Sequence, residues 1–500
     1  MTFNHRLGDV REVLAAEPDN SFDALLCDPP YGLSFMGKEW DTAVPGVEVW
    51  REVYRVLKPG AFGLVFGGTR TFDVLGVSLR RAGFERRDCL CWLYGSGFPK
   101  STAIGKMIDK AAGAEREVVG RRIRFGDRRD YETRGESVFA GQETGQATAP
   151  ATPEAATWEG YGTALKPAWE PVLVIRKPPE GTNAENCLKW GTGALNIDGG
   201  RIAAEPWSRD RQNDLSDKGD GWGFKNEIQE SHPAGRWPAN VVLSHTPECR
   251  LRGVKRVKGA GWTEEDTTAS TSFFRREGVG SKHYVDADGL ETVEDWDCSP
   301  DCPVRLLDEQ SGERPSGGAG EPETQTANCY WKFPRRVGGQ QQPSTGGASR
   351  FFYCAKASPA ERNAGCEGLE DVSCGTGALR DGCRGKIARN HHPTVKPVDL
   401  CRWLAALLLP PAREPSAHPR RLLVPFAGSG SEMIGAHLAG WDRIVGIELN
   451  PEYVEIQRRR CAWWAEHGAA GPDPAVVLAE GKARDEERAA GQLEMLEVDE

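Results

Sequence analysis

Asp28-Pro29-Pro30-Tyr31 is the stretch of this sequence that decides the fold. It follows the run Phe22 to Cys27, whose length and apolar content predict a short buried strand. In an open α/β sheet, ligands bind beyond the carboxyl ends of the strands. A carboxylate, two prolines and an aromatic ring placed there predict a functional loop, and a merely proline-stiffened turn is the alternative.

The chemistry that suits such a loop is the activation of an exocyclic amine on a nucleobase. This amine is a poor nucleophile, because its lone pair is delocalised into the ring. Asp28 and the carbonyl of Pro29 can accept both amine hydrogens, while Tyr31 stacks on the face of the base. The prolines fix φ and remove N–H donors, so the loop presents acceptors only. A base within a duplex must be flipped out to reach this loop.

Composition sets the limits on the class of protein. Five hundred residues with 39% hydrophobic content predict two or three domains. A net charge of −10 excludes a generally basic nucleic-acid coat, so contacts with DNA must come from local patches. No apolar run approaches a membrane span, and the N-terminus lacks an apolar signal segment, so we expect a cytoplasmic protein with no membrane partner. The fourteen cysteines are then expected to be reduced thiols or metal ligands.

Strands and helices alternate along the first part of the chain. Such alternation, with helices of this length, predicts βαβ units and a parallel sheet. Gly8-Asp9 precedes an amphipathic stretch that leads into the strand before Asp28. The further predicted elements are a helix over 44–57, a strand over 61–66, a helix over 71–82, and strands over 84–93 and 171–175.

The alternation resumes near the C-terminal end. The predicted elements are a helix over 398–409, a strand over 422–424, a helix over 431–439 and a strand over 443–447. The turn from Pro425 to Gly430 is glycine-rich, and Glu448 follows Gly430 by eighteen residues. This order is typical of a nucleoside-binding βαβ unit, in which glycines let the backbone approach the ligand and the acid accepts from ribose hydroxyls. An ordinary βα turn is the alternative.

Two regions interrupt the sheet pattern. Residues 99–165 form a polar insertion, and its segment 116–129 holds six arginines against two acids, which suits either an arm that touches phosphates or a solvated loop. Residues 181–392 are too long for a loop, and their seven tryptophans predict a domain with its own small core. Within it, the five basic residues of 250–258 suit a DNA backbone contact, and 350–356 is predicted to be a strand returning to the sheet.

The same region carries a candidate metal site. His245 and Cys249 are separated by three residues, and so are Cys298 and Cys302, with a proline in each gap. Paired short spacings of His and Cys can bind one tetrahedral zinc ion. A gap of three residues is looser than the usual gap of two, so two unrelated cysteine pairs remain the alternative. A zinc ion here would hold a small domain together.

Taken together, these motifs resemble the β-class amino-methyltransferases of DNA, and among them the phage- and prophage-type site-specific adenine enzymes. The resemblance rests on residues 28–40 (DPPYGLSFMGKEW), 166–171 (KPAWEP), 191–199 (GTGALNIDG) and 394–397 (TVKP). In that family the catalytic half precedes the target-recognition region, and the S-adenosylmethionine half follows it. The resemblance implies a doubly wound, Rossmann-like α/β sheet in permuted motif order, with a catalytic half over 1–180, target recognition over 181–392, cofactor binding over 393–465 and a charged tail over 466–500.

The resemblance also implies roles for individual residues. The catalytic loop is Asp28, Pro29, Pro30 and Tyr31, in which Asp28 also faces the cofactor. Asp9 matches the acidic position near the cofactor's adenine, Thr394 and Lys396 match the segment that closes over its methionine, and Glu448 would hold the ribose. The turn Phe426, Ala427, Gly428, Ser429 and Gly430 would shape the methionine end. One departure is Val424, where the family often has an aspartate.

The function expected on this basis is transfer of a methyl group from S-adenosylmethionine to the N6 amine of a flipped-out adenine in double-stranded DNA. Proximity and orientation carry much of the barrier reduction, and no covalent enzyme intermediate is needed. Two alternatives stay open: the N4 amine of cytosine as the acceptor, and a DNA-binding protein whose methylation site has decayed. The sequence also leaves open a homodimer, a restriction-enzyme partner and the recognition site.

Overall fold

The computed structural model describes most of the chain. The described residues are 2–33, 42–94, 101–123, 143–202, 208–210, 228–230, 235–246, 249–258, 290–300, 302–312, 348–355, 359–369, 372–373, 387–412 and 418–468. The predicted charged tail over 466–500 therefore lies almost wholly outside them, as do residues 124–129 of the arginine-rich segment 116–129.

A nine-stranded sheet organises the described part of the chain. Every pair of neighbouring strands is parallel, except that β7 runs antiparallel to both of its neighbours. The order across the sheet is β1 (Thr2–Leu7), β17 (Arg443–Glu448), β16 (Arg421–Pro425), β2 (Phe22–Cys27), β3 (Leu57–Phe66), β7 (Trp169–Arg176), β4 (Glu85–Leu93), β10 (Val241–Ser244) and β13 (Tyr353–Ala355).

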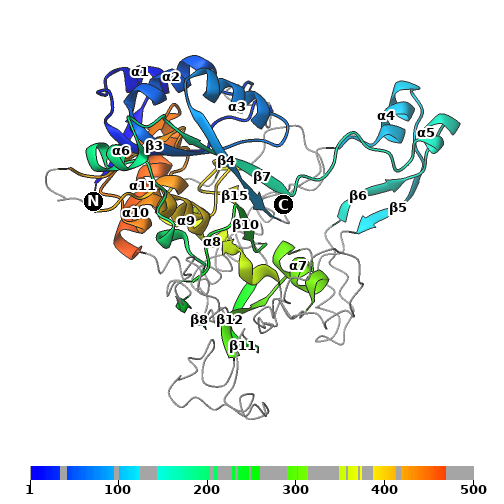
Figure 1. The fold of residues 1–500 in the computed structure, drawn as a ribbon. Helices are drawn as coiled ribbons and strands as arrows, with labels where there is room; N and C mark the ends of the chain where they lie inside the picture. Colours follow the sequence, from blue (N-terminus) through cyan, green and yellow to red (C-terminus); the bar gives the residue numbers. More distant parts are fainter. Residues whose placement is uncertain are drawn as a thin grey trace, which may run out of the picture.

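Helices cover both faces of this sheet (Figure 1). One face packs on α1 (Val10–Ala15), α2 (Val47–Val56) and α3 (Phe72–Arg81), and the other on α9 (Val398–Leu408), α10 (Ser431–Ala439) and α11 (Pro451–His467). The central strands are buried on both sides, and all six residues of β2 are buried. This burial explains why they read as continuous apolar runs. The doubly wound α/β class predicted from the sequence is confirmed.

Most of the predicted elements are present, with shifted ends. The helix predicted over 44–57 ends at Val56, and β3 begins at Leu57, four residues before the predicted strand. Lys58-Pro59-Gly60 therefore belongs to the strand that follows the helix. It tolerates proline and glycine because β2 and β3 pair irregularly near this end.

Two strands of the sheet were not predicted from the sequence. They are β1 at the N-terminus, which pairs with β17, and β10, which pairs with β4. The strand predicted over 350–356 is present as β13, the edge strand next to β10, and a 3₁₀ turn occupies Ala348–Phe351 before it. Residues from the middle of the chain therefore extend the sheet.

The polar insertion is not one continuous loop. It contains α4 (Ile104–Ala111), α5 (Pro153–Thr157) and the hairpin of β5 (Val118–Ile123) with β6 (Glu143–Thr148), and this unit projects from the body of the sheet (Figure 1). Asp109, buried at 1% exposure, accepts hydrogen bonds from the backbone of Ala151 and Thr152 and pairs with Arg116 at 2.9 Å. At least one arginine of the segment 116–129 therefore has a structural partner.

The central region also contains short elements outside the sheet. These are α6 (Asn183–Trp190), α7 (Pro303–Ser311), α8 (Pro359–Asn363) and the antiparallel hairpin of β11 (Arg250–Lys258) with β12 (Leu290–Asp297). Leu243 of β10, Cys302 and Val304 form a small hydrophobic cluster in this region. Among the described residues, no helix is both long and apolar enough to cross a bilayer.

Candidate active site

The carboxyl ends of four parallel strands, β1, β17, β16 and β2, meet at one edge of the sheet. Leu7 at the end of β1 pairs with Glu448, the last residue of β17. Pro425 at the end of β16 pairs with Ile447, the residue before Glu448. Continuing the register of β16 and β2 sets Phe426 beside Asp28. Strand pairing thus brings together segments that are hundreds of residues apart in the chain.

One cavity of about 2010 Å³ opens at this edge. It is large enough for a cofactor together with a base, since ligand sites commonly occupy roughly 300–1,000 Å³. Of the residues that the sequence assigned to the site, it is lined by Asp9, Asp28, Pro29, Pro30, Tyr31, Thr394, Lys396, Phe426, Ala427, Gly428, Ser429 and Glu448. Gly430 is not among the lining residues. It lies at the start of α10 with φ +85°, a conformation that favours glycine.

The catalytic loop is held by hydrogen bonds at both ends. Asp28 directly follows β2, and the Tyr31 hydroxyl donates to its Oδ1 at 2.8 Å. The same hydroxyl is 3.0 Å from Oε2 of Glu170. Thr71 Oγ1 donates to the Tyr31 carbonyl at 2.7 Å. The position of the Tyr31 ring is therefore fixed by contacts at its hydroxyl and at its backbone.

Lys396 completes a buried cluster of charges around Asp28. Its Nζ lies 2.7 Å from Asp28 Oδ2, 3.3 Å from the Tyr31 hydroxyl and 3.4 Å from Glu170 Oε2. Burial lowers the pKa of Lys396, but the charges of Asp28 and Glu170 raise it more, and the ammonium stays protonated. Burial, with the same two carboxylates, raises the pKa of the Tyr31 hydroxyl well above its ordinary value, so this hydroxyl stays a donor.

A further acid, Glu432 in the first turn of α10, lines the same cavity and is 4% exposed. Burial, reinforced by the charge of Asp28, raises the pKa of Glu432 to about 7. At neutral pH this side chain is therefore protonated about half of the time, which limits the negative charge beside Asp28.

The glycine turn is shaped by its neighbours. Phe426 has φ +58°, one of two described non-glycine residues with positive φ, and a left-handed residue here ends β16 sharply. A Cβ added to Gly428, at φ +51°, would lie 2.8 Å from Nε2 of His392. Burial lowers the pKa of His392 to about 4, so its ring is neutral, and its Nδ1 donates to the Thr394 carbonyl at 2.8 Å.

Arg460 of α11 stabilises the glycine turn through hydrogen bonds. This fully buried guanidinium donates to the Ser429 carbonyl at 2.7 Å, to Ser429 Oγ at 3.0 Å and to Ser431 Oγ at 3.2 Å. The hydroxyl of Ser429 is thus engaged by the protein. Val424, which stands where the resembled family often has an acid, is fully buried in the core.

Glu448 faces the cavity with its carboxylate already oriented. Oε2 accepts from the Gly428 N–H at 2.8 Å and Oε1 from the Asn450 N–H at 2.9 Å. Burial raises the pKa of Glu448, and these backbone donors oppose the increase. Asp9 caps α1 and binds Arg11, whose hydrogen bond lowers the pKa of Asp9.

The sequence did not reveal every residue of the site. Glu170 lies in the stretch 166–171 that we compared with a family, but no role was assigned to it. It is the second residue of β7, and because β7 runs antiparallel to its neighbours, this end lies at the same edge as Asp28. A carboxylate directly before an apolar strand was the available signal. Glu432, His392 and Arg460 carried none, because their roles depend on long-range packing.

The predicted metal ligands also come together. The ligand atoms of His245, Cys249, Cys298 and Cys302 all lie within 4.8 Å of one another, beyond the end of β10. They are separated along the sheet from the cavity described above, whose lining does not include them.

Known proteins similar to this chain are methylases. The putative methylase YubD of Escherichia coli K12 is 34% identical over 84 residues, which cover 16% of this chain and 37% of YubD. The chain thus matches little more than a third of that relative's length.

Solved structures give a weaker likeness. A putative DNA modification methylase from Thermus thermophilus, complexed with S-adenosyl-L-methionine, is 13% identical with a TM-score of 0.31, over 92% of this chain and 93% of that one. The PvuII DNA methyltransferase, described as cytosine-N4-specific, is 12% identical with a TM-score of 0.35, over 92% and 86% of the two chains. At such scores the likeness carries no conclusion about this chain.

The family comparison covers most of the sequence. The family described as DNA methylase, of the N6 and N4 type, matches residues 22–459 of the 500, a span that contains the catalytic loop, the glycine turn and Glu448. The protein therefore belongs to the N6/N4 DNA methylase family.

Proposed function

We propose that this enzyme transfers a methyl group from S-adenosylmethionine to the N6 amine of an adenine flipped out of double-stranded DNA. The observation that carries the proposal is that Asp28 and the glycine turn line one cavity. The two halves of the reaction can therefore take place at a single site. The division into a catalytic half, a target-recognition region and a cofactor half is part of this proposal.

The cavity suits a nucleoside cofactor on the evidence of its own residues. Gly428 lies so close to the His392 ring that a Cβ there would be 2.8 Å from Nε2, so glycine lets the turn pack tightly at the wall of the cavity. Each oxygen of Glu448 accepts one backbone N–H and retains a further lone pair, which can accept a ribose hydroxyl. Asp9 would face the adenine, and Thr394 with the turn from Phe426 to Gly430 would enclose the methionine.

When bound, S-adenosylmethionine supplies a methyl group on a sulfonium centre, with a neutral thioether as the leaving group. The protein's task is to hold the acceptor amine in line with this methyl group. Asp28 and the Pro29 carbonyl would accept the two amine hydrogens and draw electron density onto the nitrogen. After transfer, the surplus proton of the amine would pass to Asp28.

Lys396 and Glu170 would position this acceptor. A carboxylate has four lone-pair sites, and those of Asp28 that do not face Tyr31 and Lys396 remain for the amine. Lys396 Nζ donates a hydrogen bond to Asp28 Oδ2 at 2.7 Å. We therefore assign Lys396 to positioning Asp28, in addition to its place in the segment that closes over the methionine. Pro30 and the anchored hydroxyl of Tyr31 would keep the ring presented to the face of the base.

Adenine is our choice of acceptor because the first position of the loop holds Asp28 and not a serine. An aspartate at this position resembles the adenine-specific members of the family. The N4 amine of cytosine needs the same acceptors and is the second candidate. A decayed DNA-binding protein is disfavoured by the complete set of Asp28, Tyr31, Lys396 and Glu448 in one cavity.

The test is incorporation of labelled methyl from S-adenosylmethionine into duplex DNA, followed by nucleoside analysis. We expect N6-methyladenine, and we expect Asp28→Ala to lower turnover at least about a hundredfold while calorimetric binding of S-adenosylmethionine persists. Asp73→Ala, on the exposed face of α3, is the matched control. Detection of N4-methylcytosine would replace the acceptor, and unchanged turnover of Asp28→Ala would remove Asp28 from the mechanism.

A further inference from the structure

Four metal-ligating side chains meet outside the methyltransferase cavity, and each stands at the end of a secondary-structure element. His245 follows β10, Cys249 precedes β11, Cys298 follows β12, and Cys302 caps the N-terminus of α7. A bond from each of them to one centre would join the main sheet, the β11–β12 hairpin and a helix.

The distances agree with a tetrahedral metal ion. Nδ1 of His245 lies 3.4 Å from Cys298 Sγ and 3.6 Å from Cys302 Sγ. Zinc bonds of about 2.3 Å to sulfur and about 2.0 Å to nitrogen, at tetrahedral angles, place neighbouring ligand atoms roughly 3.5–3.8 Å apart. These two separations match that geometry, and all four ligand atoms lie within 4.8 Å of one another.

The two ligand pairs are built alike, which two unrelated cysteine pairs would not explain. Cys249 N–H donates to the Thr246 carbonyl at 3.0 Å, and Cys302 N–H donates to the Ser299 carbonyl at 3.1 Å. Each pair is therefore closed by the same kind of turn. The hydroxyls of Thr246 and Ser299 bond each other at 2.5 Å, and Thr246 Oγ1 lies 3.1 Å from Cys249 Sγ. These contacts orient the ligands as outer partners do in metal sites.

The surroundings suit a buried thiolate centre. His245 and Cys302 are buried, whereas Cys249 and Cys298 are half-buried. The ring of His245 stacks on Trp296 of β12, with centroids 4.0 Å apart, so the hairpin also covers the site.

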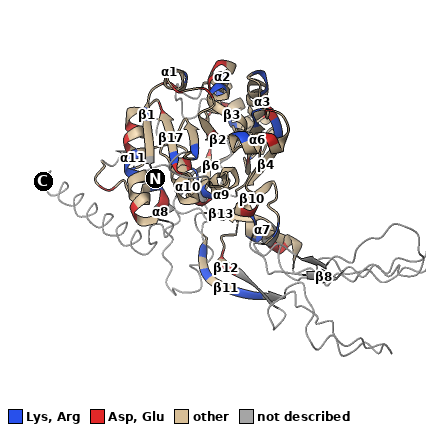
Figure 2. Ribbon diagram, turned by 60° about the vertical axis from the view of Figure 1, so that its left-hand side comes forward, with Lys and Arg blue, Asp and Glu red and all other residues tan. Residues whose placement is uncertain are grey.

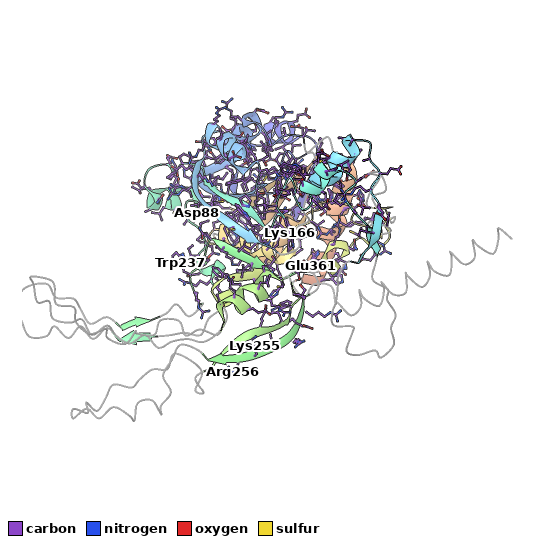
Figure 3. All side chains as sticks on the ribbon, turned by 90° about the vertical axis from the view of Figure 1, so that its right-hand side faces the viewer. Asp88, Lys166, Trp237, Lys255, Arg256 and Glu361 are labelled. Carbon is purple, nitrogen blue, oxygen red and sulfur yellow. The ribbon has the colours of Figure 1, made fainter. Side chains whose placement is uncertain are left out.

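Among the described residues, the two strands of the hairpin contact chiefly each other. The hydrophobic cluster of this region contains three buried residues, Leu243, Cys302 and Val304, and two hydrophobic residues of the hairpin, Leu251 and Val254, are exposed. The hairpin extends away from the sheet, with Lys255 and Arg256 on it (Figure 3). Small cores of this kind are commonly stabilised by a structural metal ion.

We propose that His245, Cys249, Cys298 and Cys302 bind one structural Zn²⁺ ion that fixes the β11–β12 hairpin to the end of the sheet. Four protein ligands fill a tetrahedral shell, so the ion has no open position for catalysis. The proposal is independent of the methyl acceptor, because none of the four ligands lines the catalytic cavity.

The experiment is metal analysis of the full chain, expressed with zinc and purified without an affinity tag or chelator. We expect about one zinc ion per chain. Loss of a direct ligand in Cys298→Ser should lower zinc affinity by roughly a hundredfold or more, since even outer-partner changes cost about 10–100-fold. Cys89→Ser, a half-buried cysteine of β4 outside the cluster, should leave the metal content unchanged.

A second measurement keeps the proposal testable if the ligand variants do not fold. Cobalt exchanged into the unmodified protein should give the visible bands of tetrahedral thiolate coordination. Removal of the metal should also speed tryptic cleavage at the basic residues of β11, because the base of the hairpin is released. A zinc-free protein without the cobalt bands, or a disulfide joining two of these cysteines, would overturn the assignment.

Discussion

Glu432 provides a direct test of the electrostatics inside the catalytic cavity. Its carboxyl is 4% exposed, and burial raises its pKa from 4.5 to about 7 in the folded protein. The unfolded chain releases this proton near pH 4.5, whereas the folded chain keeps it to about pH 7. The folded state therefore loses stability relative to the unfolded state as the pH rises through this window.

The magnitude follows from the size of the pKa shift. A shift from 4.5 to about 7 corresponds to at most about 3 kcal/mol, and most of this free energy develops between pH 5 and pH 8. Glu432→Gln keeps the shape and removes the titration. The variant should therefore gain roughly 2 to 3 kcal/mol relative to the unmodified protein between these two pH values.

The assay is urea unfolding of both proteins at several pH values from 5 to 8, followed by circular dichroism. Only the change with pH is interpreted, because a constant difference reports packing of the amide. Glu12→Gln, an exposed first-turn glutamate of α1, is the matched control and should show no such trend. If Glu432→Gln and the unmodified protein lose stability in parallel with pH, burial does not hold this carboxyl protonated.

Two further predictions concern the cofactor side of the cavity. Glu448→Ala should weaken calorimetric binding of S-adenosylmethionine by about ten- to a hundredfold, which is the loss expected for hydrogen bonds to a charged group. The control Glu455→Ala, at an exposed position of α11, should bind as the unmodified protein does. Equal affinities of Glu448→Ala and the unmodified protein would remove the ribose role. Gly428→Ala should also reduce this affinity, because its Cβ would lie 2.8 Å from the His392 ring. Gly440 also has a positive φ, but a Cβ there would meet no atom within 4 Å, so Gly440→Ala should bind S-adenosylmethionine normally. Similar binding by both glycine variants would show that His392 moves aside freely.

Two of the basic residues of β11 that were predicted to contact DNA already have acidic partners within the hairpin. Arg252 lies 3.2 Å from Asp297, and Lys255 lies 3.5 Å from Asp295, both across the hairpin. Figure 2 shows the basic residues along β11. These pairs are exposed and therefore weak, so the contact with a DNA backbone stays a prediction.

The sequence alone was enough to identify the local elements and the two turns that line the cavity. Apolar periodicity located β2, α3, β4, α9, β16, α10 and β17 within a few residues, because these segments bury regular faces. The loop at Asp28 and the turn at Gly428 carry residue types that few structural roles require. The spacing of His245, Cys249, Cys298 and Cys302 likewise indicated a cluster before any fold was known.

Only the tertiary structure decided which of these pieces meet. The order β1, β17, β16, β2 sets Glu448, Phe426 and Asp28 at one edge, and the reversal of β7 brings Glu170 to the same edge. Strand order and direction depend on contacts between distant segments, and local patterns do not encode them. The hydrogen bond from Lys396 to Asp28 could not be predicted for the same reason. It joins side chains that are 368 residues apart, in a cavity that exists only after the sheet has formed.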